Sequence, residues 1–142
     1  MFAKQLTVFI ENRPGRLSEV LDVLKQGNVS ILSLSLADTT EFGLLRLIVD
    51  NAAVGREKLT EHGFSSLLSE VLIIRIPHKV GSLQSLLKVL DKNGISTEYM
   101  YGLSIESEEA YVVLKTSDLT KTEQLLAENC VQTIDISTLT NA

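Results

Sequence analysis

Two hydrophobic periodicities alternate along this chain. Short apolar runs, or apolar residues at every second position, are typical of strands, whereas a spacing of three and four is typical of amphipathic helices. Residues 6–10 form a short apolar run, and four apolar residues then recur at helical spacing: Leu17, Val20, Leu21 and Leu24. The first half therefore predicts the order βαββαβ. We expect strands over 6–10, 29–36, 44–49 and 64–68, helices from Leu17 to near Gly27 and over 51–62, and a hairpin loop at residues 38–41.

The second half repeats this pattern at a constant offset of 66 residues, which aligns Gly81 with Gly15. The matched pairs are Leu6 and Leu72, Ile10 and Ile76, Leu17 and Leu83, Leu21 and Leu87, Val23 and Val89, Leu24 and Leu90, Ser30 and Ser96, and Leu59 and Leu125. We expect a duplication without gaps. It predicts strands over 71–76, 95–105, 110–115 and 131–137, a turn at 106–109, and helices over 82–92 and 118–128, the last capped by Ser117 or Asp118.

No flexible linker separates the two copies, because residues 64–77 are mostly apolar. A unit of about 65 residues buries only about 60% of its unfolded surface and is marginally stable alone. We therefore expect two domains, residues 1–70 and 71–142, that pack into one compact body.

Composition narrows the class of protein. The 142 residues are 44% hydrophobic, carry a net charge of −5 and contain no basic run, which argues against a nucleic-acid partner. The one cysteine, Cys130, cannot form an intramolecular disulfide, and we expect it to be a small buried residue in a reducing compartment. The start resembles no secretory signal, and no apolar run approaches the roughly 18 residues of a membrane span. These features predict a cytoplasmic protein without a membrane partner.

The turn at residues 11–18 joins the first strand to the first helix. Pro14 presets the backbone of a turn, and Gly15 allows angles that a Cβ would disfavour. Free amides at the following helix start favour a small anion such as a carboxylate. A plain strand-to-helix turn is the alternative interpretation of the same residues.

The βαββαβ order is that of the ferredoxin-like fold, in which two helices cover one face of a four-stranded antiparallel sheet. The sequence Glu11-Asn12-Arg13-Pro14-Gly15-Arg16-Leu17-Ser18 closely resembles the strand-to-helix loop of ACT domains, which are small amino-acid-sensing modules. It is most similar to the Asn-x-Pro-Gly-x-Leu loop of serine-regulated phosphoglycerate dehydrogenases and of acetohydroxyacid synthase regulatory subunits. As two copies, the chain resembles the stand-alone tandem ACT proteins of bacteria. The resemblance implies an α+β fold of two ferredoxin-like units packed side by side, with antiparallel sheets and helices on one face.

The resemblance also implies amino-acid sites at the interface between the two copies. In the family, the loop of one unit holds the ligand's charged groups and the second strand of the other unit closes the pocket. The first site would combine Asn12, Arg13, Pro14, Gly15 and Leu17 with Ser96 and Thr97. The mirror site would combine His78, Val80 and Gly81 with Ser30 and Ile31.

Several positions depart from the family pattern. Serine-binding members have a histidine two residues before the loop asparagine, where this chain has Ile10, and several carry an asparagine where it has Ser30 and Ser96. Serine is therefore not favoured as the ligand. The second loop lacks both the asparagine and the proline, although His78 and Lys79 could still contact a carboxylate. We expect two unequal sites or a single site, with the first loop as the competent one.

The sequence shows no recognisable arrangement of residues for metal binding or nucleophilic catalysis. His62 and His78 have no neighbouring ligands at metal-binding spacing, and His62 is expected to cap a helix end. Ser33 and Ser35 are expected on the outward face of a strand rather than as nucleophiles. The sequence thus predicts a regulatory protein without catalytic activity or cofactor, which binds a small amino acid and signals to a metabolic partner. Association into a homodimer is compatible with this prediction. The alternatives are an interaction subunit without a ligand and a ferredoxin-like enzyme such as an acylphosphatase-type hydrolase, whose arginine-centred phosphate loop is not recognisable here.

Overall fold

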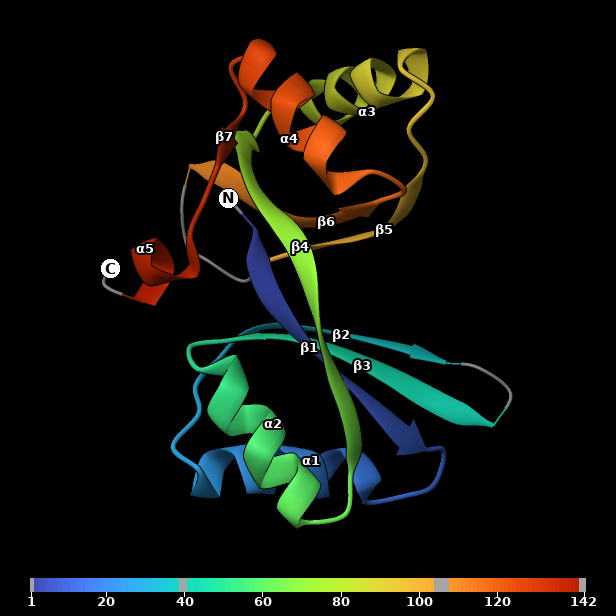
Figure 1. Cartoon of the computed structure of the whole chain (residues 1–142), viewed down its shortest axis with the longest axis vertical. Coiled ribbons are helices and arrows are strands. Elements are labelled where there is room, and N and C mark those ends of the chain that lie inside the picture. The colour runs from blue at the N-terminus through green and yellow to red at the C-terminus, as the bar shows by residue number, and fades with distance from the viewer. Residues whose placement is uncertain (1, 39–40, 104–107, 141–142) are drawn as a thin grey trace. The chain divides into compact units, whose positions relative to one another are not determined.

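The computed structural model describes residues 2–38, 41–103 and 108–140. Parts of the expected loop at 38–41, strand at 95–105 and turn at 106–109 lie outside these residues. In chain order the elements are β1 (Ala3–Glu11), α1 (Arg16–Gln26), β2 (Ile31–Asp38), β3 (Phe42–Val49), α2 (Ala52–Glu61), β4 (Ser65–Pro77), α3 (Ser82–Lys92), β5 (Thr97–Gly102), β6 (Glu109–Thr116), α4 (Leu119–Glu128), β7 (Gln132–Thr133) and α5 (Ile136–Thr140) (Figure 1).

The chain divides into two compact units. The first unit is Lys4–Ser69, and the second unit contains the described residues from Glu70 onward together with residues 2–3. Strand β4 contributes to both, because the two strands expected at 64–68 and 71–76 form one strand of 13 residues. The intervening residues include no glycine or proline that would break the extended backbone.

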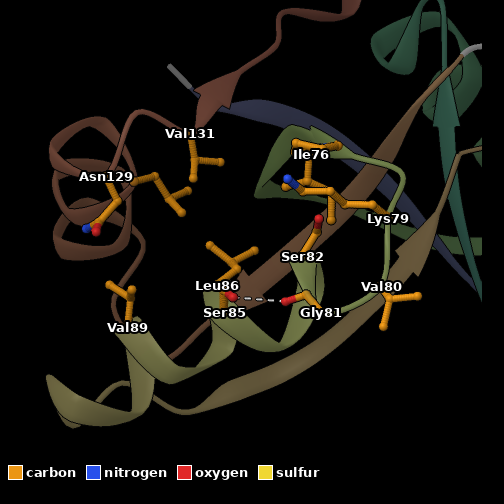
Figure 2. A pocket seen from close by; sticks show the side chains of 12 residues that line it. Ile76, Lys79, Val80, Gly81, Ser82, Ser85, Leu86, Val89, Asn129 and Val131 are labelled. Atoms are coloured by element: carbon orange, nitrogen blue, oxygen red, sulfur yellow. Dashed lines mark hydrogen bonds between the residues drawn. The ribbon is translucent and has the colours of Figure 1, made fainter.

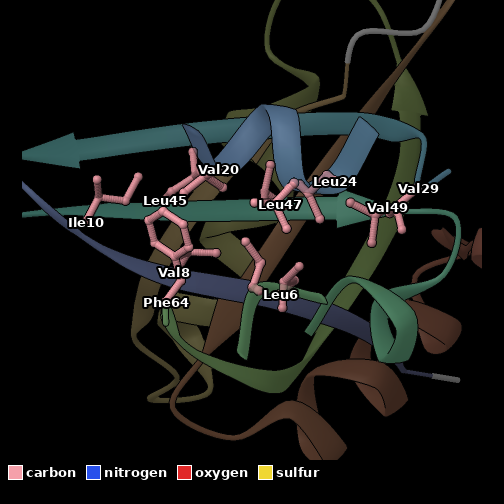
Figure 3. Packing of buried hydrophobic residues seen from close by; sticks show 12 residues of the cluster. Leu6, Val8, Ile10, Val20, Leu24, Val29, Leu45, Leu47, Val49 and Phe64 are labelled. Carbon is pink, nitrogen blue, oxygen red and sulfur yellow. The ribbon is translucent and has the colours of Figure 1, made fainter. Parts of the chain in front are cut away.

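In the first unit the strand order is β2-β3-β1-β4, and α1 and α2 lie together on one face of the sheet (Figure 1). The pairs β1/β3 and β2/β3 are antiparallel, with Leu6 opposite Leu47. Alternate residues of β1 and β3 point toward the helices, as strand geometry requires. They form a closely packed core with residues of α1 and α2 and of the segments just before β2 and β4 (Figure 3): Leu6, Val8, Ile10, Val20, Val23, Leu24, Val29, Leu45, Leu47, Val49, Leu59 and Phe64. The predicted βαββαβ fold is confirmed.

The second unit repeats this plan, with the strands adjacent in the order β5-β6-β4-β7 and α3 and α4 on one face. Leu72 of β4 lies opposite Leu114 of β6, as Leu6 lies opposite Leu47 in the first unit. Its core is a separate cluster of the same kind: Leu72, Ile74, Ile76, Leu86, Leu90, Ile95, Val112, Leu114 and Leu126.

The predicted duplication without gaps is wrong by one residue. The offset of 66 holds through β5, since Gly102 lies opposite Val112 as Leu36 lies opposite Leu45, but from β6 onward it is 67. The fully buried counterpart of Leu59 is therefore Leu126 rather than Leu125. One extra residue therefore lies between β5 and β6, and the core positions of the two units still correspond.

The C-terminal part also differs from the prediction of one strand over 131–137. Only Gln132–Thr133 pairs with β4, and a short helix, α5, follows. Asp135 starts that helix, since its Oδ1 accepts a hydrogen bond from the Ser137 amide at 3.3 Å and its carbonyl accepts one from Thr138 at 3.0 Å. Cys130 is exposed rather than buried, because it occupies a left-handed position (φ 59°) in the turn after α4.

The β2 serines lie on the sheet face away from the helices, as expected, but Ser33 is not exposed there. Ser33 is buried, whereas Leu34 and Leu36 are 46% and 51% exposed. The register places both leucines on the helix side, opposite Leu47 and Leu45. Because β2 is the edge strand of the first unit, these two side chains remain about half exposed although they lie on the core side.

Side-chain caps define the helix ends as predicted. Asp118 is the N-cap of α4, and its Oδ1 accepts a hydrogen bond from the Lys121 amide at 3.0 Å. His62 is the C-cap of α2, with its Nδ1 2.9 Å from the Lys58 carbonyl oxygen. Both predicted caps are thus confirmed.

Candidate functional site

The two loops that precede α1 and α3 have the same backbone geometry. Gly15 and Gly81 are the N-cap residues, each with φ 87°. The first i to i−4 bonds run from Glu19 to Gly15 and from Ser85 to Gly81, both at 3.0 Å. The amides of the first helical turn consequently point out of each helix, where they can meet an anionic group.

Gly15→Ala is expected to lower the free energy of unfolding by about 1–2 kcal/mol, because an alanine disfavours the left-handed backbone. The added Cβ would meet no atom within 4 Å, so the cost is one of backbone conformation alone. Urea unfolding followed by circular dichroism measures this cost. Gly81→Ala should give the same value, since the same φ and the same open space occur there. A cost below 0.3 kcal/mol, roughly the error for additive changes, would contradict the prediction.

The first loop borders a hollow of about 280 Å³. Three predicted site residues, Asn12, Arg13 and Leu17, line it together with the ends of β1, β2 and β3. Pro14 and Gly15 are exposed in the adjoining turn. Arg13 is already paired, since its Nε lies 2.9 Å from Glu11 Oε2 with both side chains more than half exposed. The polar part of this hollow is therefore built mainly by Asn12 and the loop backbone.

A contact that the sequence analysis missed lies behind this loop. The guanidinium carbon of Arg16 lies 4.3 Å from the centre of the Phe64 ring, and its Nη1 is 2.6 Å from Glu19 Oε2. The ring and the carboxylate hold Arg16 against the body of the unit, with only 18% of its side chain exposed. An arginine directly after the Pro-Gly pair was visible in the sequence, but its aromatic partner is distant along the chain.

The predicted residues at the start of β2 lie elsewhere in the first unit. Ser30 and Ile31 border a separate hollow of about 340 Å³ with Lys25 and Asp50. The Ser30 amide donates to Asp50 Oδ1 at 2.9 Å, which closes the turn into the strand. Their role in the mirror site stays a prediction.

The residues of the second loop are divided between two hollows. His78 lies in a polar one that also contains Arg75 and Glu109, which form an ion pair at 2.9 Å between Nε and Oε2. Val80 and Gly81 line a cavity of about 370 Å³ between α3 and α4 (Figure 2).

Ser96 and Thr97 are exposed at the start of β5. The Ser96 amide donates a hydrogen bond to Ser117 Oγ at 3.1 Å, in the place of the Ser30 contact with Asp50. Their role as ligand contacts also stays a prediction.

Among the described residues, no group of three or more His, Cys, Asp or Glu side chains is arranged to hold a metal ion. No helix in the described ranges has the length and apolar character needed to cross a membrane.

Two βαββαβ units, each with a left-handed glycine at the start of its first helix, define a ferredoxin-like protein of the tandem class. A family model described as an ACT domain pair matches residues 1–142, and the chain therefore belongs to this family. ACT domains are regulatory modules, so the predicted family and its class of function, amino-acid-sensing regulation, are confirmed at that level.

Solved structures agree with this assignment. The crystal structure of protein BT0572 from Bacteroides thetaiotaomicron is 34% identical, covers 94% of this chain and 92% of that one, and has a TM-score of 0.89. The aspartate kinase regulatory subunits of Thermus thermophilus and Thermus flavus are 14% and 17% identical, with TM-scores of 0.61 and 0.62. The alignments cover 88% and 87% of this chain and 91% and 88% of those subunits, and at these identities they show a shared fold alone. Among curated proteins, none matches the chain.

Proposed function

We propose that this protein is a regulatory protein without catalytic activity that binds a small free amino acid at the Asn12 loop and signals its concentration to a metabolic enzyme. The observation that carries the proposal is the hollow beside that loop, where Asn12 and Leu17 line a space of about 280 Å³ next to a helix start. The volume is near the lower limit of typical small-molecule sites, roughly 300 Å³. It therefore suits a ligand with few atoms.

The chemistry of the loop suits a zwitterion. An ammonium group needs an acceptor such as the amide oxygen of Asn12, and a carboxylate needs converging N–H donors such as those at the start of α1. Glu11 and Arg13 are paired with each other, so neither charge dominates the hollow. The contribution of Ser96 and Thr97 from the second unit remains the expectation that the family resemblance implies.

Thermal unfolding of the whole chain against each common amino acid tests the proposal. A ligand present at 100 times its Kd stabilises the folded state by about 2.7 kcal/mol, so one amino acid should raise Tm by roughly 2–6 °C. Asn12→Ala should abolish the shift by removing the ammonium acceptor. Gln26→Ala is the matched control, because it removes an exposed amide at the other end of α1 and should leave the shift unchanged. A shift that survives Asn12→Ala would contradict the assignment of the site.

The edge strand of the first unit favours a second candidate function, an interaction subunit that needs no metabolite. Leu34 and Leu36 of β2 and Phe42 of β3 are each about half exposed, and β2 has a free edge in its unit. Exposed strand edges with apolar side chains readily pair with another chain. If no amino acid shifts Tm, whereas Leu36→Lys abolishes capture of a metabolic enzyme, this second function replaces the first.

A further inference from the structure

A largely apolar cavity lies between α3 and α4 of the second unit (Figure 2). Its volume is about 370 Å³, within the range of roughly 300–1,000 Å³ in which small-molecule sites fall. The walls are aliphatic side chains from both helices, from β4 and from the residue just before β7: Ile76, Leu86, Val89, Leu126 and Val131. Such walls offer water few hydrogen bonds, whereas a hydrocarbon group of matching size is stabilised by burial against them.

The first unit fills the corresponding space with its own side chains. The Arg16 guanidinium lies over the Phe64 ring there, and Phe64 is 6% exposed. With the offsets established above, Ser82 takes the place of Arg16, and Val131 that of Phe64. The backbone agrees, because Phe64 and Val131 each donate to the last buried leucine of the preceding helix, at 2.9 and 2.8 Å. Two replacements of large side chains by small ones therefore open the cavity in the second unit.

Four polar side chains border this apolar space, and the exposed Lys79 is the charged one: Lys79, Ser82, Ser85 and Asn129. The Lys79 side chain extends along one side of the cavity, and the Ser82 hydroxyl points toward it (Figure 2). Ser82 Oγ is buried and has no hydrogen-bond partner within the described part of the chain, which is costly unless a ligand atom supplies one. Ser85, by contrast, has its hydroxyl 2.9 Å from the Gly81 carbonyl oxygen. Among the described residues, no aspartate or glutamate lines the cavity, so the charged side chain present there is positive.

We propose that the second unit binds a small apolar monocarboxylate in this cavity, with the carboxylate on Lys79 and Ser82 and the hydrocarbon group between α3 and α4. Among the described lining residues, the side-chain amide of Asn129, whose Nδ2 donates to the Leu125 carbonyl oxygen at 2.8 Å, offers only a neutral acceptor for an ammonium group. The site therefore favours an acid without an ammonium group over the corresponding amino acid. This site is separate from the Asn12 loop and does not depend on the function proposed above.

The probe is 4-methylpentanoate, added to the full chain and followed by methyl NMR. Saturable shifts are expected at Val89, Leu126 and Val131, with no shift at their first-unit counterparts Val23 and Leu59. The alcohol 4-methylpentan-1-ol, which lacks the carboxylate, and leucine, which adds an ammonium group, should both bind more weakly. Absence of saturable shifts at millimolar acid, or equal binding of the alcohol, overturns the proposal.

Two variants and one control test the residues to which the proposal assigns ligand contacts. Lys79→Met keeps the length of the side chain but removes its charge, and should weaken binding about fivefold, as expected for a partly exposed ion pair. Lys88→Met removes an exposed charge of α3 that does not line the cavity and should change nothing. The double variant Ser82→Arg with Val131→Phe introduces the first-unit pair and should abolish binding.

Unchanged affinity in the Lys79 variant overturns the assignment of the carboxylate, and unchanged affinity in a folded double variant overturns the site itself. Asn12→Ala should leave the NMR shifts intact. Failure of the cavity proposal can therefore be distinguished from failure of the proposed function.

Discussion

Leu24→Ala is expected to lower the free energy of unfolding of the first unit by about 2.7–5 kcal/mol, the range found for fully buried leucines. Leu24 is fully buried in the core of that unit, facing β1 and β3 from α1 (Figure 3). Truncation removes apolar contacts and leaves a void that rigid neighbours cannot fill. Urea unfolding, with the midpoint and slope fitted together, measures the loss.

Leu34→Ala is the matched control for this prediction. It makes the same chemical change in the same unit, but Leu34 is 46% exposed on the edge strand. Its cost should remain within about 1 kcal/mol, because much of the side chain already contacts water in the folded state. Equal losses in the two variants would contradict the arrangement of the core described here.

Thr122→Val is expected to cost about 1–3 kcal/mol, the penalty for leaving a buried polar group without a partner. Its Oγ1 lies 2.8 Å from Thr116 Oγ1 and also donates to the Asp118 carbonyl at 2.7 Å. Both threonines are buried, and valine would leave Thr116 with no hydroxyl partner in α4. Thermal and urea unfolding of the single variant measure the effect.

The double variant Thr116→Val with Thr122→Val separates this explanation from simple loss of packing. Removing both hydroxyls leaves neither group unsatisfied, so much of the lost stability should return. The first unit has Val49 and Gly55 at the corresponding positions, which shows that this fold needs no polar pair there. Thr120→Val, an exposed change on the same helix, should cost less than about 0.5 kcal/mol. A double variant no more stable than Thr122→Val would contradict the mechanism.

Much of the fold could be predicted from local pattern. The order of strands and helices, the start of α1 after Pro14-Gly15 and the cap at Asp118 each depend on residues close together in the sequence. The exposure of the β2 side chains could not be predicted in the same way. Alternation shows that two faces exist, but the pairing with β3 decides which face points inward, and the position at the sheet edge decides how far it is covered.

The candidate sites also differ in how far they could be predicted from local sequence. Asn12 and Leu17 could be predicted together because a loop and the helix that follows it are neighbours in any fold. The cavity between α3 and α4 could not, since it depends on Ser82 and Val131, which meet only when the second unit is folded.

The sequence by itself determined the duplication, the βαββαβ order, the membership in the ACT family and the identity of the loop that precedes each first helix. These properties rest on local periodicity and on short motifs, which a linear sequence displays directly. The tertiary structure alone decided where the repeat shifts by one residue, which leucines remain exposed at the edge, and which of two homologous helix pairs encloses a cavity. Those outcomes depend on contacts between residues far apart in the chain, and such contacts are set by strand register and by the volumes of side chains that face one another.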